Sequence, residues 1–167
     1  MSQNLILAGT EATSTTLTWI LCLLLNNRDV LKLAKEELDL QVCRERWVKD
    51  TDIKSLIYLQ AIVKETLRLY RPAPLSVQHE AMEDCQVSDF HIPKGTRLFV
   101  NLWKLYRDPT VWLDPKVFST YRFLTTQASI DASGQHFEFI TFGSGRRSCP
   151  GLTFAMQVIH LTFGTLI

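Results

Sequence analysis

The sequence has almost no net charge. Its 167 residues include 18 lysines and arginines against 17 acidic residues, which gives a formal net charge of +1. Proteins that bind nucleic acid through its phosphates need a basic field, so we predict no nucleic-acid binding. The sequence also lacks repeats and low-complexity segments. With 46% hydrophobic and 21% charged residues, it has the composition of a globular protein that builds a core.

Cysteine is scarce, and its spacing argues against the common cysteine-rich sites. The four cysteines lie far apart, and no two of them form the close CxxC pair of a zinc or redox site. A chain of this size does not need disulfides to hold its core. We expect Cys22, within an apolar run, to be a buried free thiol, and Cys43 and Cys85 to be structural. Cys149 is the exception because of the residues around it.

Polar, solvated segments are missing from both ends. The chain enters a long apolar stretch almost at once, and it stops at Leu166-Ile167 inside another one, without a capping glycine. Complete domains usually end at solvated termini. We therefore expect residues 1–167 to be one part of a larger domain.

The longest apolar segment covers residues 5–25. Its length would suffice for a membrane span, which takes ~20 apolar residues. Glu11 and the cluster Thr13-Ser14-Thr15-Thr16 argue against a span, since an acidic side chain is costly at lipid depth. We prefer a central helix buried in a larger protein, and a single-span membrane protein is the alternative.

The rest of the chain mixes helical periodicity with short strands. Apolar residues at helical spacing predict helices at 28–45, 53–56 and 58–69. Pro72 and Pro74 end the last of these. Short runs of strand-forming residues predict a small irregular sheet from 75–77, 85–87, 90–92 and 98–100. A helix at 102–106, mostly loop over 107–139, and a helix with Pro150 in its first turn complete the pattern.

Residues 142–151 offer what a metal-binding thiolate needs. Cys149 precedes a predicted helix start, where free N–H groups and the helix dipole favour an anion. Nearby glycines leave room for a large flat group to approach the backbone. Phe142 can keep water from the sulfur, and Arg147 can pair with a carboxylate of the bound group. The residues concerned are Phe142, Gly143, Gly145, Arg147, Cys149 and Gly151.

A glycine-rich surface turn with a passive cysteine would explain the glycines alone. The order Phe, Gly, Arg, Cys, Gly is more restrictive, and it matches F-x-x-G-x-R-x-C-x-G at every specified position. In this segment the chain resembles the cytochrome P-450 family. The resemblance implies that haem is the cofactor, that Cys149 is the axial ligand of its iron, and that Arg147 pairs with a haem propionate.

Two other segments match the same family in the expected order. Glu65-Thr66-Leu67-Arg68 resembles the family's E-x-x-R, in which the acid and the base share a helix face. The third partner in the family is the arginine of P-x-R-F, which corresponds to Arg122, although Thr120 replaces the usual proline. The resemblance implies a buried Glu65–Arg68–Arg122 network with a structural role, since losing one member would leave buried charge unpaired.

The first predicted helix carries Ala8-Gly9-Thr10-Glu11-Ala12-Thr13, which resembles the family's motif A/G-G-x-D/E-T-T/S. The resemblance implies that Ala8, Gly9 and Ala12 border the haem and that Glu11 and Thr13 serve proton delivery. Ala12 stands where the family has the threonine directly after the acid. Thr13 cannot simply replace it, because one helical step turns a side chain by ~100°. Ordered water, a substrate hydroxyl or a peroxide substrate are the alternatives for that role.

The resemblance covers residues 1–167 and sets the expected fold and function. The fold class is mainly α: the C-terminal part of the cytochrome P-450 fold, with a small irregular sheet and the cysteine loop, and without the family's N-terminal half. The implied activity is monooxygenation of a small organic substrate with electrons from an NADPH-dependent reductase. Segments 92–96 and 103–109 resemble plant members, which lie on the endoplasmic reticulum membrane in full-length form. His79 falls where such proteins often place a propionate contact, or is an ordinary surface or core histidine.

The alternative is a truncated, catalytically inactive haem-binding remnant. The family's N-terminal half contains much of the substrate pocket, and residues 1–167 do not correspond to it. Without that half, the apolar helix at 5–25 would be exposed on at least one face, and the isolated chain would be prone to aggregation.

Overall fold

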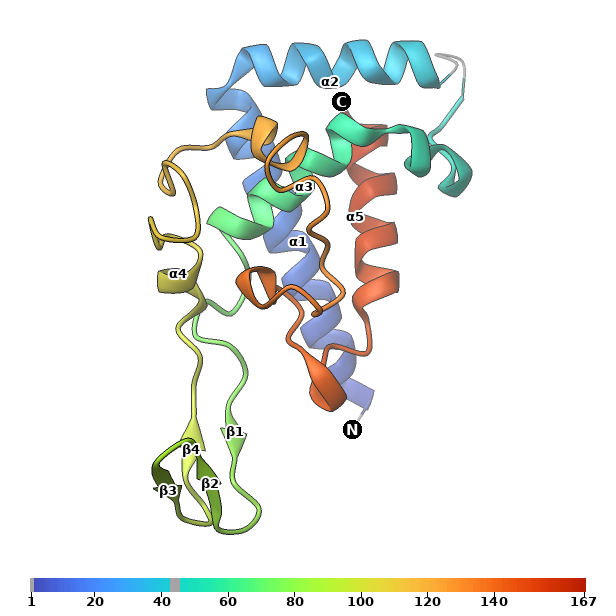
Figure 1. The fold of residues 1–167 in the computed structure, drawn as a ribbon. Helices are drawn as coiled ribbons and strands as arrows, with labels where there is room; N and C mark the ends of the chain where they lie inside the picture. Colours follow the sequence, from blue (N-terminus) through green and yellow to red (C-terminus); the bar gives the residue numbers. More distant parts are fainter. Residues whose placement is uncertain (1, 43–45) are drawn as a thin grey trace.

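Helices form the body of the structure. The computed structural model describes residues 2–42 and 46–167, so Cys43 lies outside the described residues (Figure 1). The α-helices are α1 (Ser2–Asn26), α2 (Arg28–Gln41), α3 (Ile57–Leu69), α4 (Leu102–Leu105) and α5 (Leu152–Leu166). Short 3-10 helices are η1 (Asp50–Ser55), η2 (Thr120–Phe123), η3 (Phe137–Phe139) and η4 (Gly145–Arg147). The predicted mainly helical fold is confirmed.

The core lies where α3 packs against α1 and α5 (Figure 1). α3 is buried along most of its length because it carries apolar residues on nearly every side. Beneath it, the rings of Tyr106, Trp112, Phe123 and Phe139 pack together, with centroids 5.4 to 6.5 Å apart. The long loop from 107 to 139 is therefore held down by aromatic side chains, although it has little regular structure.

α1 buries one face only. Thr16, Ile20 and Leu24 recur every fourth residue and lie in the core, whereas Ile6 and Leu7 are 69% and 65% exposed. The expectation of a helix buried all round is thus met on one side alone. Cys22, which we expected to be buried, is exposed because it lies off the buried stripe. Among the described helices, none has the length and apolar character that a membrane crossing requires.

The strands form two short antiparallel ladders instead of one sheet. β2 (Cys85–Val87) pairs with β3 (Phe90–Ile92) as predicted, and β1 (His79–Glu80) pairs with β4 (Arg97–Leu98). The strand predicted at 75–77 is wrong. Ser76 has a positive φ of 59°, and the carbonyl of Pro74 accepts hydrogen bonds from the N–H groups at the start of α4. This segment is a turn that anchors α4.

Two predicted helix boundaries move. α2 ends at Gln41, before residue 45, because Val42 is extended, with φ −124° and ψ 131°. α5 begins at Leu152, so Pro150 lies in the turn before the helix and not in its first turn. The N–H of Leu152 donates to the carbonyl of Cys149 at 3.3 Å, which ties the cysteine to the helix start.

Candidate functional site

The loop before α5 holds Cys149 by its backbone. The N–H of Cys149 donates to the carbonyl of Phe142 at 2.8 Å and closes the loop. Gly143 and Gly145 have φ values of 78° and 67°, in the region where a side chain is strained. The thiol of Cys149 is free and exposed. A Cβ on Gly151 would lie 3.8 Å from the Cys149 sulfur, so the sulfur lies directly beside that glycine.

Gly134, outside the segment 142–151, allows that segment to pack closely against residues that precede it in sequence. Gly134 has a φ of 84°, and a Cβ there would lie 2.6 Å from the carbonyl oxygen of Gly143. The hydroxyl of Ser144 donates to the carbonyl of Gly134 at 2.6 Å. The sequence analysis missed Gly134 because the contact joins segments that only the fold brings together.

The side chains flanking the cysteine divide into packed and open ones. Phe142 is half-buried against the hydrophobic core. Arg147 is exposed at the last position of η4, so its guanidinium is available to an anionic group. A Cβ at Gly145 would meet no atom within 4 Å. The loop thus presents the thiol, an open backbone and a cation on its exposed side.

The motif on α1 is exposed in its first half. Ala8, Gly9 and Glu11 are exposed, and a Cβ at Gly9 would meet no atom within 4 Å. The hydroxyl of Thr13 donates to the carbonyl of Gly9 at 2.8 Å, so its proton is committed to the helix backbone. Ala12 is half-buried and brings no hydroxyl. α1 and α5 run side by side, with the cysteine loop at the same end as the start of α1 (Figure 1).

Glu65, Arg68 and Arg122 come together beneath α3. Arg68 donates to both carboxylate oxygens of Glu65, at 2.8 and 2.9 Å, and both side chains are fully buried. Arg122 Nε lies 3.5 Å from Glu65 Oε2. The backbone N–H of Ser119 also donates to Glu65, at 2.9 Å. The acid therefore joins α3 to the loop that leads into η2.

The remaining donors of both arginines go to backbone carbonyls. Arg68 donates to the carbonyls of Tyr106 and Pro115 at 2.6 and 2.8 Å, and Arg122 donates to that of Leu113. Burial lowers the pKa of Arg122, and the charge of Glu65 opposes that effect. Thr120, at the usual proline position, is buried and donates to the Tyr58 hydroxyl at 3.3 Å. A side-chain contact thus holds the start of η2 where proline would restrict the backbone.

His79 lies away from the buried residues of the site. It is exposed in β1, opposite Leu98 of β4. Its propionate role therefore stays a prediction. Within residues 2–42 and 46–167, no group of three or more His, Cys, Asp or Glu side chains is arranged to hold a metal ion. A single cysteine ligand suits a metal that brings its other ligands in a prosthetic group.

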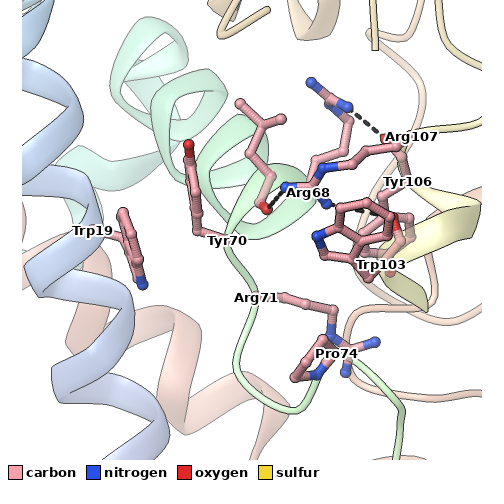
Figure 2. A pocket seen from close by; sticks show the side chains of 9 residues that line it. Trp19, Arg68, Tyr70, Arg71, Pro74, Trp103, Tyr106 and Arg107 are labelled. Atoms are coloured by element: carbon pink, nitrogen blue, oxygen red, sulfur yellow. Dashed lines mark hydrogen bonds between the residues drawn. The ribbon is translucent and has the colours of Figure 1, made fainter. Parts of the chain in front are cut away.

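A cavity of about 210 Å³ lies between α1, the end of α3 and α4 (Figure 2). The rings of Trp19 and Tyr70 stack across its edge, with centroids 4.1 Å apart and planes 9° apart. Arg71 and Arg107 also line it. Neither arginine was assigned a role from the sequence: no motif contains Arg71, and Arg107 was noted only within the segment 103–109 that resembles plant members.

One protein family matches the chain over its whole length. The Cytochrome P450 family matches residues 1–167. The chain belongs to the cytochrome P450 family. The exposed thiol, the open space at Gly145 and the exposed Arg147 fit the haem that this family implies, because they leave part of the loop open to a flat group with anionic substituents.

Curated plant relatives match over nearly the whole chain. It is 56% identical over 164 residues to cytochrome P450 CYP82J17 of Trigonella foenum-graecum, covering 98% of this chain and 31% of that one. It is 62% identical over 144 residues to vinorine hydroxylase of Rauvolfia serpentina, covering 86% and 30%. Nicotine N-demethylase CYP82E3 of Nicotiana tomentosiformis is 55% identical over 164 residues, covering 98% and 31%. The chain spans about 31% of the length of such cytochromes P450.

The fold agrees with a solved cytochrome P450. The zebra fish enzyme, in a structure with abiraterone, superimposes with a TM-score of 0.85 at 34% sequence identity. The match covers 95% of this chain and 36% of the zebra fish chain. Part of the cytochrome P450 fold is therefore formed by residues 1–167.

Proposed function

We propose that residues 1–167 form the haem-thiolate portion of a plant monooxygenase, in which Cys149 would supply the thiolate that holds the haem. One observation carries the proposal: the Cys149 thiol is free and exposed at the end of a loop closed by its own N–H bond to Phe142. The domain assignment is part of the proposal. Residues 1–167 correspond to the C-terminal portion, and the rest of the substrate pocket belongs to the remainder of a full-length protein.

The chain's own residues divide the work of holding haem. Cys149 would supply the thiolate ligand, and Phe142, Gly145 and Gly151 would lie beside the group. Arg147 would pair with a propionate, and His79 would offer a second such contact. From α1, Ala8, Gly9 and Ala12 would also border the group. Once bound, haem supplies the electron-transfer and dioxygen chemistry that side chains lack.

The substrate and the electron donor are inferred from relatives. Two of the relatives named above carry the names of vinorine and nicotine, and protopine 6-monooxygenase of Eschscholzia californica carries that of protopine; all three compounds are plant alkaloids. We propose a small organic substrate of that class. An NADPH-dependent reductase supplies the electrons, and the full-length protein lies on the endoplasmic reticulum membrane.

Proton delivery separates this function from a haem-binding remnant without activity. Glu11 is exposed, but Ala12 has no hydroxyl and the Thr13 hydroxyl donates its hydrogen bond to the carbonyl of Gly9. Proton delivery would then need ordered water or a substrate hydroxyl, or the substrate would be a peroxide. The inactive remnant is the second candidate function, and the missing hydroxyl at Ala12 is the observation that favours it.

The test is haem reconstitution of the chain, followed by reduction and carbon monoxide. We expect a red-shifted Soret band of the thiolate type in the native chain and its loss in Cys149→Ser. Cys22→Ser is the matched control, since it removes another exposed thiol. A band that persists in Cys149→Ser would refute the ligand assignment. Turnover of an alkaloid with reductase and NADPH, in a chain that shows the band, would support the enzyme. A band without turnover would support the inactive remnant.

A further inference from the structure

The side chains of Arg71 and Tyr106 both bond Thr141, the residue directly before the segment 142–151. Arg71 Nη2 donates to the carbonyl of Thr141 at 2.6 Å. The hydroxyls of Tyr106 and Thr141 share a hydrogen bond of 3.2 Å. Thr141 is buried and directly precedes Phe142, whose carbonyl accepts the N–H of Cys149. Thr141, at the start of the loop, is thus held by one hydrogen bond to its backbone carbonyl and by another to its side-chain hydroxyl.

The same contacts connect the loop to the buried ion pair. Tyr106 is fully buried, and its carbonyl accepts the 2.6 Å bond from Arg68 described above. Hydrogen bonds therefore link Glu65 to Arg68 and Arg68 to the backbone of Tyr106, and the hydroxyl of the same tyrosine bonds Thr141, the residue before Phe142. Burial raises the pKa of Tyr106, so its hydroxyl keeps its proton at neutral pH. It remains available for the bond to Thr141.

Arg71 is placed by the end of α3 and by the cavity. It is the second residue after the helix and adjoins Tyr70, whose ring stacks on Trp19 (Figure 2). Its Nε donates to the carbonyl of Pro72 at 3.1 Å, and its guanidinium lies 5.9 Å from the centre of the Tyr106 ring. Its Nη1 is buried without a hydrogen-bond partner among the described residues. Among the described residues, the hydrogen bond to Thr141 is thus the one that joins Arg71 to the start of the cysteine loop.

We propose that Arg71 and Tyr106 are positioning residues for the haem ligand: they fix Thr141, and through the Phe142 carbonyl they fix the backbone of Cys149. This inference rests on the proposed function, because it concerns the geometry of the proposed iron ligand. Neither residue touches the reacting atoms. Removing either contact releases the start of the loop, and the Cys149 sulfur then samples positions from which it ligates poorly.

Arg107 provides a matched control. It lines the same cavity, and its Nη2 donates to the carbonyl of Leu69 at 2.6 Å, the same length as the Arg71 bond (Figure 2). It also lies over an aromatic ring, 4.6 Å from the centre of Trp103. Its contacts hold the α4 region to α3 and do not reach the cysteine segment. Arg107→Gln thus removes a comparable cation and carbonyl bond elsewhere.

The first measurement is amide hydrogen exchange on the full chain without haem. We expect Arg71→Gln to speed exchange of the Cys149 N–H about tenfold, because a charge-assisted bond is lost. Tyr106→Phe and Thr141→Val should each speed exchange of the Cys149 N–H by a smaller factor. The two substitutions together should speed it no more than the larger single effect, since both remove the same hydrogen bond. Arg107→Gln should leave the Cys149 N–H unchanged. Equal effects of Arg71→Gln and Arg107→Gln, or none for Arg71→Gln, would overturn the proposal.

The second measurement asks whether the effect reaches the ligand. Each variant is reconstituted with haem, reduced and treated with carbon monoxide. We expect the share of the Soret band that moves from the thiolate-type position to shorter wavelength to be about tenfold larger in Arg71→Gln than in Arg107→Gln. Arg71→Lys, which can still donate to Thr141, should restore most of the thiolate band. A lost band in the native chain would refute haem ligation while hydrogen exchange still decides the positioning role. Equal band loss in Arg71→Gln and Arg107→Gln would overturn that role.

Discussion

At the scale of single residues, Gly134 has the sharpest requirement. Its Cβ-free backbone lets the Gly143 carbonyl approach, and a methyl group there would lie 2.6 Å from that oxygen. Gly95 has nearly the same φ, 82° against 84°, but open space where its Cβ would be. The two glycines therefore differ in packing and not in backbone strain.

We expect Gly134→Ala to destabilise the chain more than Gly95→Ala. The control substitution should cost about 1–2 kcal/mol from the left-handed backbone alone. Gly134→Ala adds the clash with Gly143 and should also displace the cysteine loop. The free energy of unfolding, measured in urea for both variants, checks this. Equal losses would show that the loop moves away without cost.

Glu65 is the second residue-scale case, because one carboxylate neutralises two arginines. Replacing it with glutamine leaves Arg68 and Arg122 buried without an anion, and we expect a loss of about 3–5 kcal/mol in the free energy of unfolding. Glu36→Gln is the control. It breaks an exposed pair with Lys32 at 3.8 Å and should cost well under about 1 kcal/mol. Similar small losses in both would mean that the buried network contributes nothing to stability.

At the scale of elements, α5 carries a buried histidine beyond the cysteine loop. Nδ1 of His160 lies 2.7 Å from the carbonyl of Met156, and its Nε2 is buried without a partner among the described residues. Burial lowers the pKa of His160 below its ordinary value of 6.5, the Met156 carbonyl opposes the shift, and Lys64 adds to it. The helix therefore packs best with a neutral imidazole.

This predicts a loss of stability in acid. As pH falls through about 6.5, the unfolded chain gains a proton that the folded chain resists, so the free energy of unfolding decreases. His160→Gln should flatten that dependence between about pH 7 and pH 5, whereas His91→Gln, which removes an exposed ring, serves as the control. Urea denaturation at several pH values gives the slopes. Parallel slopes for the native chain and His160→Gln would contradict the assignment.

At the scale of the whole molecule, apolar side chains are exposed on elements that surround the open side of the cysteine loop. Ile6 and Leu7 on α1 and Phe154 on α5 are each at least 65% exposed. Exposed apolar surface of this kind leads to association or is covered by another part of a larger protein. The chain spans about 31% of the length of its relatives, which agrees with the second reason for such exposure.

We expect residues 1–167 alone to self-associate as the concentration rises. Sedimentation velocity over a concentration series should show growing species, and haem should reduce them by covering part of the exposed surface. Ile6→Ser with Phe154→Ser should weaken association, whereas Leu113→Ser, which removes a leucine that is 80% exposed on the loop, is the control. A monomer at all concentrations would contradict this expectation.

The sequence by itself determined what depends on neighbouring residues. Helical periodicity placed α3, and the prolines after it ended the helix, because both act through local backbone geometry. The order and spacing around Cys149 identified the family, because the Phe, Gly, Arg, Cys and Gly of the pattern are all contained in residues 142–151. The roles of Glu11, Thr13 and His79 stay predictions.

Only the tertiary structure decided what depends on residues distant in sequence. The contacts of Gly134 with Gly143, and of Arg71 with Thr141, join segments that no periodicity links. A turn at 75–77 takes the place of the predicted strand because the Pro74 carbonyl accepts hydrogen bonds from the start of α4 and the Ser76 hydroxyl accepts one from the N–H of Val100. The exposure of one side of α1 follows from which neighbours pack against it. Local sequence specifies an element and its motif, whereas long-range packing decides which face is covered and what holds the cysteine loop in place.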